Sequence, residues 1–315
     1  MCKYALKHSV FFLEAAPSFL LLPLFVSPVK CAMMKGEMEE ECEAREQPRN
    51  PRRLVVKVGT STLTRETGSL NLQNMEHLAR VLADLEGMGY QPVLVSSGAI
   101  GIGTKKLRLG ERPTELRMKQ AAAAVGQCRM MHIYDKLFAE YNRTVAQILL
   151  TGEDVESPVR SEHLHNTFEA LLELGVIPVV NENDSVSSAE IETGQCKVLG
   201  DNDTLSAIVA RLCGAGLLVL FSDIDGLYDA DPRTHPDARL IHQVEAITPE
   251  LRAMAGGAGT WRGTGGMATK LNAAQLCLER GGHGHRQRGA DGGPLRHRGG
   301  EERGHPLFCP RGALQ

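Results

Sequence analysis

This sequence contains few aromatic residues, and its positive and negative charges nearly balance. Aromatic side chains make up 4% of its 315 residues, and the formal net charge is −3. A dedicated nucleic-acid-binding protein usually carries a basic excess, so this balance argues against that class. Glycine is plentiful, with 33 residues. This is expected of an α/β enzyme with many tight turns between strands and helices.

Paired cysteines and long apolar runs are missing as well. The eight cysteines are scattered and form no C-x-x-C pair, so neither a zinc site nor a disulfide framework is predicted. A reduced, cytoplasmic setting fits best. The apolar run at 19–26 is too short to span a bilayer. We therefore expect no membrane partner and no nucleic-acid partner.

The N-terminal stretch 1–51 precedes the first regular pattern. Residues 34–52 are charged and lack apolar periodicity, which predicts a disordered segment. We interpret 1–51 as a disordered or spurious extension, with translation starting at Met33, Met34 or Met38. A targeting segment is the alternative interpretation.

From Arg53 onward, short apolar runs alternate with helical periodicity. Strands rich in Val, Ile and Leu that alternate with helices predict a three-layer α/β/α sandwich with a mostly parallel central sheet. In such sheets ligands bind beyond the carboxyl ends of the strands. The strands are expected at 54–59, 92–98, 144–150, 176–181 and 217–222, and the helices at 71–88, 113–140, 160–174 and 201–213.

Glycine-rich turns end the first two predicted strands. Lys57 is followed by Gly59 and two hydroxyl residues, a pattern that can place an ammonium and backbone N–H groups against phosphate oxygens. A lysine that merely extends from the sheet edge to solvent is the alternative. The turn at 96–103 is rich in glycine but matches neither a Walker A loop nor a dinucleotide fingerprint.

Two clusters of carboxylates and amides follow at 181–184 (NEND) and 200–203 (GDND). Amides can hold the carboxylate of an amino-acid substrate, and an Asp can pair with its ammonium. The alternative is turn and helix-capping chemistry, and Asp201 or Asn202 is a good candidate to cap the next helix.

Two further turns suit a nucleotide. The strand at 217–222 ends in Ser222 and Asp223, although the Asp-Gly that follows is also an ordinary turn signal. The loop 263–270 (GTGGMATK) opens a helix and carries Lys270 one turn in, which suits it to neutralising a transferring phosphoryl group. A flexible linker is the alternative for this loop.

Taken together and in order, these turns resemble the amino-acid kinase family, and within it the members that phosphorylate glutamate. The match runs from about Leu54 to Arg280 and rests on VVKVGTS, VSSGAI, KQAAAAVGQ, PVVNENDSV, GDNDTLSA, SDIDGLYDADPR and GTGGMATK. The resemblance implies an amino-acid kinase domain over 52–280.

The resemblance also implies roles for individual residues. Lys57 and Lys270 would stabilise the transferring phosphoryl group, and Asp203 would organise the two lysines. Ser97, Asp184 and Asn202 would bind L-glutamate. The ATP site would consist of Lys57, Ser222, Asp223, Thr264, Gly265, Gly266, Met267, Ala268, Thr269 and Lys270. Mg²⁺ would bind chiefly through ATP, and no protein metal site is expected.

The implied reaction is ATP-dependent phosphorylation of the glutamate side-chain carboxylate to glutamyl 5-phosphate, the first step of proline synthesis. Relatives of this type are often homo-oligomers inhibited by proline. Three alternatives stay open: a family member acting on acetylglutamate, carbamate or a nucleotide, a non-catalytic glutamate- or proline-binding protein, and a non-functional product of a damaged gene. The motifs could also belong to the kinase half of a larger bifunctional enzyme.

The tail departs from the family pattern. Where the family continues with an apolar strand, a helix and a final strand, residues 281–315 are rich in Gly, Arg and His and show no apolar period. Codons for this stretch, shifted by one base, permit apolar strands such as TVIVN. We therefore hypothesise a frameshift near Gly281, which sequencing of the encoding DNA would test.

Overall fold

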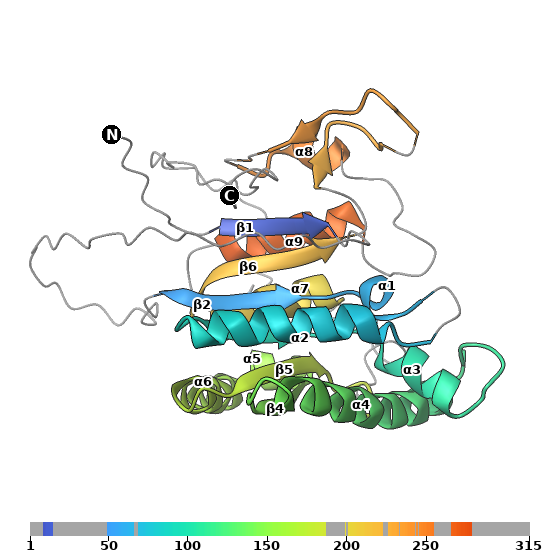
Figure 1. Ribbon diagram of the computed structural model, residues 1–315. Helices are drawn as coiled ribbons and strands as arrows, with labels where there is room; N and C mark the ends of the chain where they lie inside the picture. Colours follow the sequence, from blue (N-terminus) through green and yellow to red (C-terminus); the bar gives the residue numbers. More distant parts are fainter. Residues whose placement is uncertain are drawn as a thin grey trace, which may run out of the picture.

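The computed structural model describes residues 9–14, 49–65, 69–186, 199, 201–222, 226–232, 234–242, 244, 246–254 and 266–278. Within these residues, a parallel sheet has the strand order β1-β6-β2-β3-β5-β4. Its strands are β1 (Ser9–Glu14), β2 (Asn50–Lys57), β3 (Gln91–Val95), β4 (Val145–Leu150), β5 (Ile177–Glu182) and β6 (Ala215–Ser222). A small antiparallel pair, β7 (Leu227–Tyr228) and β8 (Leu240–Ile241), lies apart from this sheet (Figure 1).

Helices connect and cover these strands (Figure 1). The longer ones match the predicted periodicity within a few residues, except that α4 begins after Pro113 rather than at it, and α3 is a separate helix before it. The helices are α1 (Thr60–Leu63), α2 (Leu72–Gly87), α3 (Ala99–Lys106), α4 (Leu116–Ala139), α5 (Gly152–Glu156), α6 (Pro158–Glu173), α7 (Asn202–Leu212), α8 (Pro249–Met254) and α9 (Met267–Leu278).

Two apolar clusters lie on opposite faces of the sheet. Successive residues of a strand point to opposite faces, so Val55 of β2 joins one cluster and Val56 the other. The first cluster contains buried side chains of α6, α7 and α9, and the second contains those of α2 and α4. This arrangement confirms the predicted three-layer α/β/α sandwich.

The β2 strand lies at the centre of the sheet and sets the location of the site. The chain passes from β2 through α2 to β3 on one side, whereas α7 leads from β5 to β6 on the other side of β2. Connections that diverge from neighbouring strands leave a crevice beyond their carboxyl ends, where ligands of such sheets bind. The polar turns singled out in the sequence follow these strands.

The N-terminal extension is not disordered throughout. Residues Ser9–Glu14 form β1, which pairs in parallel with β6, and β2 begins at Asn50. These two segments are strands, whereas the sequence predicted either a disordered or a spurious extension over 1–51. An apolar, β-prone segment can pair with the open edge of a strand however far away it lies in the sequence. The remaining residues of the extension and the tail 281–315 lie outside the described residues, so the frameshift stays a hypothesis.

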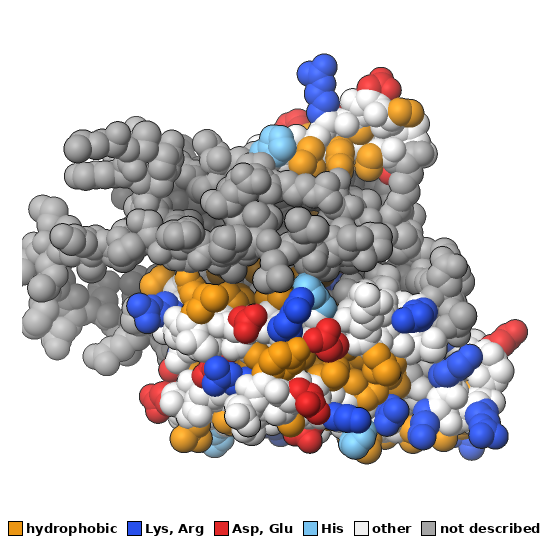
Figure 2. All heavy atoms as spheres, in the orientation of Figure 1, with side chains coloured by type: hydrophobic (Ala, Val, Ile, Leu, Met, Phe, Trp, Pro, Cys, Tyr) orange, Lys and Arg blue, Asp and Glu red, His pale blue; other side chains and the backbone are white. Residues whose placement is uncertain are grey.

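Side chains of both charges are interspersed on the face that α2 and α4 cover (Figure 2). Lys and Arg side chains gather toward the end where α3 lies. Across the part of the chain that the structure describes, no helix is both long and apolar enough to cross a membrane.

Candidate active site

Polar side chains collect where four parallel strands end. Lys57 is the last residue of β2, Ser96 and Ser97 follow β3, Asn181 lies near the end of β5, and Ser222 ends β6. Because the strands are parallel, these ends lie along one edge of the sheet. The side chains of Lys57, Ser96, Ser97, Asn181 and Ser222 are all at most 9% exposed. This edge is the candidate active site.

Helices α3 and α7 begin at the same edge. Gly98 precedes α3 with a φ of 93°, a left-handed conformation that glycine adopts without steric cost. Asp201 caps α7, since its Oδ1 accepts hydrogen bonds from the backbone N–H of Asp203 at 2.7 Å and of Thr204 at 2.9 Å. The predicted capping role is thus confirmed. Helix N-termini direct unpaired N–H groups and positive dipole ends outward, which favours anionic ligands.

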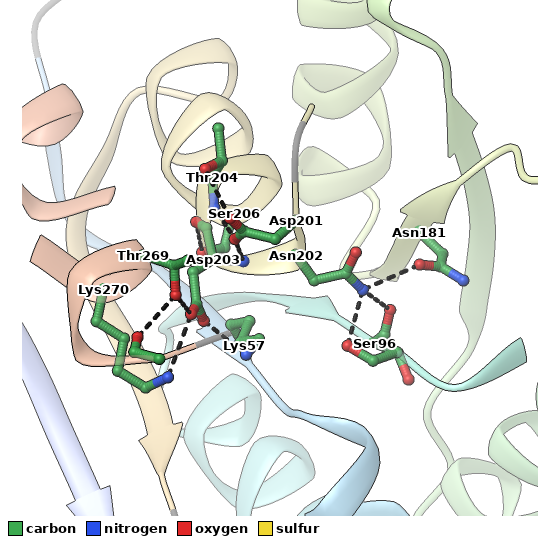
Figure 3. Close-up of polar contacts among 12 residues, drawn as sticks. Lys57, Ser96, Asn181, Asp201, Asn202, Asp203, Thr204, Ser206, Thr269 and Lys270 are labelled. Atoms are coloured by element: carbon green, nitrogen blue, oxygen red, sulfur yellow. Dashed lines mark hydrogen bonds and ion pairs between the residues drawn. The ribbon is translucent and has the colours of Figure 1, made fainter. Parts of the chain in front are cut away.

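The lysine cluster consists of Lys57, Asp203, Thr269 and Lys270 (Figure 3). The ammonium of Lys57 lies 2.6 Å from Oδ1 of Asp203, and that of Lys270 lies 3.2 Å from Oδ2. The Thr269 hydroxyl donates to Oδ2 at 2.7 Å. The cluster joins β2, α7 and α9, so one carboxylate holds two cations from distant parts of the chain.

Neighbouring positive charges lower the pKa of the Asp203 carboxyl. Burial alone would raise the pKa of the Asp203 carboxyl, but the ammonium groups of Lys57 and Lys270 and the hydrogen bond from Thr269 outweigh it, so the pKa lies below its ordinary value. Asp203 is only 1% exposed. With two lysines around one carboxylate, this buried cluster carries a net positive charge. Such an arrangement can stabilise the oxygens of a transferring phosphoryl group.

Gly59, two residues after Lys57, leaves space beside the Lys57 ammonium. A side-chain carbon added at Gly59 would lie 3.7 Å from the Lys57 ammonium nitrogen. The bare backbone of Gly59 therefore leaves room beside that nitrogen, where a phosphate oxygen could bind.

The amide cluster lies beside the lysine cluster and consists of Ser97, Gln127, Asn181 and Asn202. The side-chain NH₂ of Asn202 donates to the Ser97 hydroxyl at 2.7 Å, to the Ser96 carbonyl at 2.9 Å and to Oδ1 of Asn181 at 3.2 Å. The side-chain NH₂ of Asn181 donates to Oε1 of Gln127 at 3.0 Å. Asn202 and Asp203 are adjacent at the start of α7. In Figure 3 the Asn202 side chain points toward Ser96 and Asn181, and the Asp203 side chain points toward Lys57 and Lys270.

The strand end under the amide cluster is held from the α4 side. The Ser96 hydroxyl lies 3.0 Å from the Tyr134 hydroxyl and donates to the sulfur of Met130 at 3.3 Å. Burial raises the pKa of Tyr134 and the hydrogen bond to Ser96 opposes that rise, so the phenol stays neutral. These contacts fix the backbone from which the Ser96 carbonyl and Ser97 project.

The structure brings six of the residues that the sequence singled out into two groups of direct contacts. Lys57, Asp203, Thr269 and Lys270 are in contact, as are Ser97 and Asn202. Asp184 follows β5 by two residues, Ser222 ends β6, and Gly266 to Ala268 open α9. Asp223, Thr264 and Gly265 lie outside the described residues.

The sequence gave no reason to assign a role to Gln127. It indicated Asn181 only as part of the polar cluster at 181–184. Gln127 lies in the interior of α4, within the KQAAAAVGQ motif. Its only sequence signal is a polar residue on an otherwise apolar and small-residue stretch of helix.

Among the described residues, no group of three or more His, Cys, Asp or Glu side chains is placed to hold a metal ion. Mg²⁺ commonly binds through one or two carboxylates, water and substrate phosphates rather than through an all-protein cage.

Comparison with protein families matches residues 52–285 to the Amino acid kinase family. The chain belongs to this family, as the order of its motifs predicted. Its relatives include the glutamate 5-kinase of Clostridium perfringens, which is 54% identical over 74% of this chain and 86% of that protein. The glutamate 5-kinase of Clostridium tetani is 56% identical over 72% of this chain and 83% of that protein. That of Listeria innocua is 52% identical over 74% and 84%.

A solved structure of UMP kinase from Bacillus anthracis is also similar to this chain. It has a TM-score of 0.46 and 16% sequence identity, and the match covers 73% of this chain and 84% of that one.

Proposed function

We propose that this chain transfers the γ-phosphoryl group of ATP to the side-chain carboxylate of L-glutamate and forms L-glutamyl 5-phosphate, the first intermediate of proline biosynthesis. Relatives more than 50% identical carry the name glutamate 5-kinase. The observation that carries the proposal is the pair of lysines held by Asp203, one residue away from Asn202 and its amide cluster. A phosphoryl-neutralising group and a site for a small polar acceptor thus lie side by side.

The lysine cluster would act on the phosphoryl group. An oxygen of the glutamate carboxylate forms a bond to the γ-phosphorus as the bond to the β,γ-bridging oxygen breaks, and ADP leaves with that electron pair. The carboxylate is already deprotonated at neutral pH, so no general base is required. Lys57 and Lys270 would neutralise charge on the transferring oxygens, and positioning supplies the rest of the rate enhancement.

The remaining residues would divide between the two substrates. Ser97, Asp184 and Asn202 would bind glutamate. Ser222, Asp223 and the segment Thr264 to Lys270 would hold ATP, with the N-terminus of α9 facing its phosphates. Mg²⁺ would reach the site bound to the ATP phosphates and add positive charge there.

Three further expectations belong to this proposal. The cytoplasm is the expected location, a homo-oligomer the expected assembly, and proline a possible feedback inhibitor. Each is tested separately, by fractionation, by light scattering and by titration of proline into the assay.

Glutamate-dependent ADP release, with hydroxylamine present to trap glutamyl phosphate as its hydroxamate, tests the proposal. We expect hydroxamate from the wild-type chain and at least a hundredfold less from Lys270→Ala. Lys136→Ala is the matched control, because Lys136 is an exposed lysine in the last turn of α4.

Acceptor preference separates the rival functions. Faster turnover with acetylglutamate, carbamate or a nucleoside monophosphate than with glutamate would move the chain to another branch of the family. Glutamate binding by a folded chain without ADP release would instead favour a non-catalytic binding protein.

A further inference from the structure

We propose that Gln127 is a positioning residue for glutamate: through Asn181 it supports the orientation of the Asn202 amide that the Ser96 carbonyl also holds, and thereby the hydrogen-bonding groups that the site offers to the substrate. This inference rests on the proposed function, because it concerns how that function selects its acceptor.

The hydrogen bonds of the amide cluster all run in one direction. Gln127 offers its oxygen to the NH₂ of Asn181, and Asn181 offers its oxygen to the NH₂ of Asn202. An amide has its donor and acceptor on opposite branches, so fixing one amide fixes the next. The Ser96 carbonyl, which can only accept, and Asn181 together set the orientation of Asn202, so a side chain of α4 contributes to that orientation through Asn181.

This orientation determines which atoms of Asn202 and Ser97 are available to the substrate. The NH₂ of Asn202 is directed at the Ser96 carbonyl, the Ser97 hydroxyl and Asn181. The oxygen of Asn202 is therefore the atom left to accept, which suits the ammonium of an amino acid. The Ser97 hydroxyl accepts from Asn202, so its own proton can be donated to a carboxylate.

Burial makes this orientation costly to lose. Gln127 is 7% exposed and Asn181 2% exposed, so water cannot readily replace a missing partner. The NH₂ of Gln127 has no hydrogen-bond partner among the residues that the structure describes. An apolar side chain would avoid that unsatisfied donor, which indicates that the oxygen of Gln127, rather than its bulk, is what the site requires.

Kinetics of Gln127→Met test the proposal. Methionine has a similar length but offers no comparable acceptor, so the Asn181 amide can rotate and turn its NH₂ toward that of Asn202. We expect the KM for glutamate to rise about tenfold, with the KM for ATP within twofold of wild type. An unchanged KM for glutamate would overturn the proposal.

A double-mutant cycle separates positioning from general damage. If Gln127 acts through Asn202, then Gln127→Met has no further effect on the KM for glutamate in the Asn202→Ala background. If the two effects multiply, Gln127 acts independently of Asn202 and the proposal fails.

Gln127→Glu is the second variant, because it keeps an acceptor for the NH₂ of Asn181. We expect its KM for glutamate to stay within about threefold of wild type. A rise of tenfold or more in folded Gln127→Glu would overturn the proposal, whether or not Gln127→Met folds. Hydroxamate formation by the wild-type chain is measured alongside. Its absence would refute the proposed function itself, whereas its presence with a normal Gln127→Met would refute only the positioning role.

Discussion

The lysine cluster and the amide cluster are neighbours at one edge of the sheet, yet they are built on opposite principles. In the first, one buried carboxylate holds two ammonium groups, and the attraction between opposite charges sets the geometry. In the second, neutral amides are linked end to end, and the direction of each hydrogen bond sets the geometry. Charge suits the stabilisation of a phosphoryl group, whereas directional hydrogen bonds suit the discrimination of a small acceptor.

Asp203→Asn should have the largest effect, because it removes the charge that holds the lysine cluster together. Two buried ammonium groups would then lack a counter-ion, and loss of one partner of a buried ion pair costs about 3–5 kcal/mol. We expect kcat to fall by about a thousandfold, together with a lower midpoint of thermal unfolding. A kcat within tenfold of wild type would contradict the role of Asp203.

Asn202→Ala should change the amide cluster and spare the lysine cluster. The variant loses the acceptor proposed for the substrate ammonium and the donor that orients Ser97. We expect the KM for glutamate to rise about 10- to 100-fold, with the KM for ATP within twofold. An equal rise in both constants would show that the two clusters do not divide the substrates between them.

Gly126→Ala should disturb the amide cluster by forcing α3 and α4 apart. A side-chain carbon at Gly126 would lie 1.8 Å from the carbonyl oxygen of Ala99, so α3 and α4 would have to separate. Overpacking of this kind costs about 1–3 kcal/mol in the free energy of unfolding, and the displaced α3 begins directly after Ser97 and Gly98. Denaturant unfolding and the KM for glutamate measure both effects.

Gly101→Ala is the control for that variant. Gly101 lies in α3, and an added carbon would meet nothing within 4 Å. Alanine is the better helix former, so we expect a gain of up to about 1 kcal/mol. If both substitutions proved equally harmless, close packing of the two helices would not be needed to hold the site.

Acid should weaken the lysine cluster but not the amide cluster, which contains no carboxylate. The folded pKa of Asp203 lies below its ordinary value, so its contribution to stability is fully present above the unfolded pKa of about 4 and is lost as the pH falls through the folded value. The difference in unfolding free energy between wild type and Asp203→Asn should therefore be smaller at low pH than at pH 7. A difference independent of pH would mean that the Asp203 charge contributes nothing to stability.

Thiol modification should have the smallest effect, since neither cluster contains a cysteine. Burial raises the pKa of Cys213 and of Cys277 to about 12 in each case, whereas Cys128 is exposed. Of these three, iodoacetamide should label Cys128 alone, as peptide mass spectrometry would show. Cys128 follows Gln127 on α4 but is exposed where Gln127 is buried, so its labelling should leave the KM for glutamate unchanged.

Local patterns in the sequence were sufficient to predict much of the fold. The apolar run that forms β2 and the periodicity of α2 predicted both elements, because burial on a sheet or along a helix face imposes these patterns directly. Asp201 as the cap of α7 was likewise predictable, since capping involves only the next few residues.

Long-range pairing was not predictable in the same way. The partnership of β1 with β6 depends on an open strand edge that the sequence does not reveal. The roles proposed for Lys57 and Lys270 came from resemblance to a family, and the sequence alone gives no reason for the two lysines to meet at Asp203. Gln127 escaped prediction because its partner Asn181 lies on a different element, and a polar residue in a stretch of small helical residues does not by itself indicate a role.

Binding of glutamate in the absence of ATP is the most direct test of the division between the two clusters. Isothermal titration of glutamate into wild type, Asn202→Ala and Asp203→Asn would compare adjacent residues at the start of α7. We expect Asp203→Asn to bind glutamate with nearly wild-type affinity and Asn202→Ala to bind it at least tenfold more weakly. Glutamate binding retained by Asn202→Ala and lost by Asp203→Asn would contradict that division.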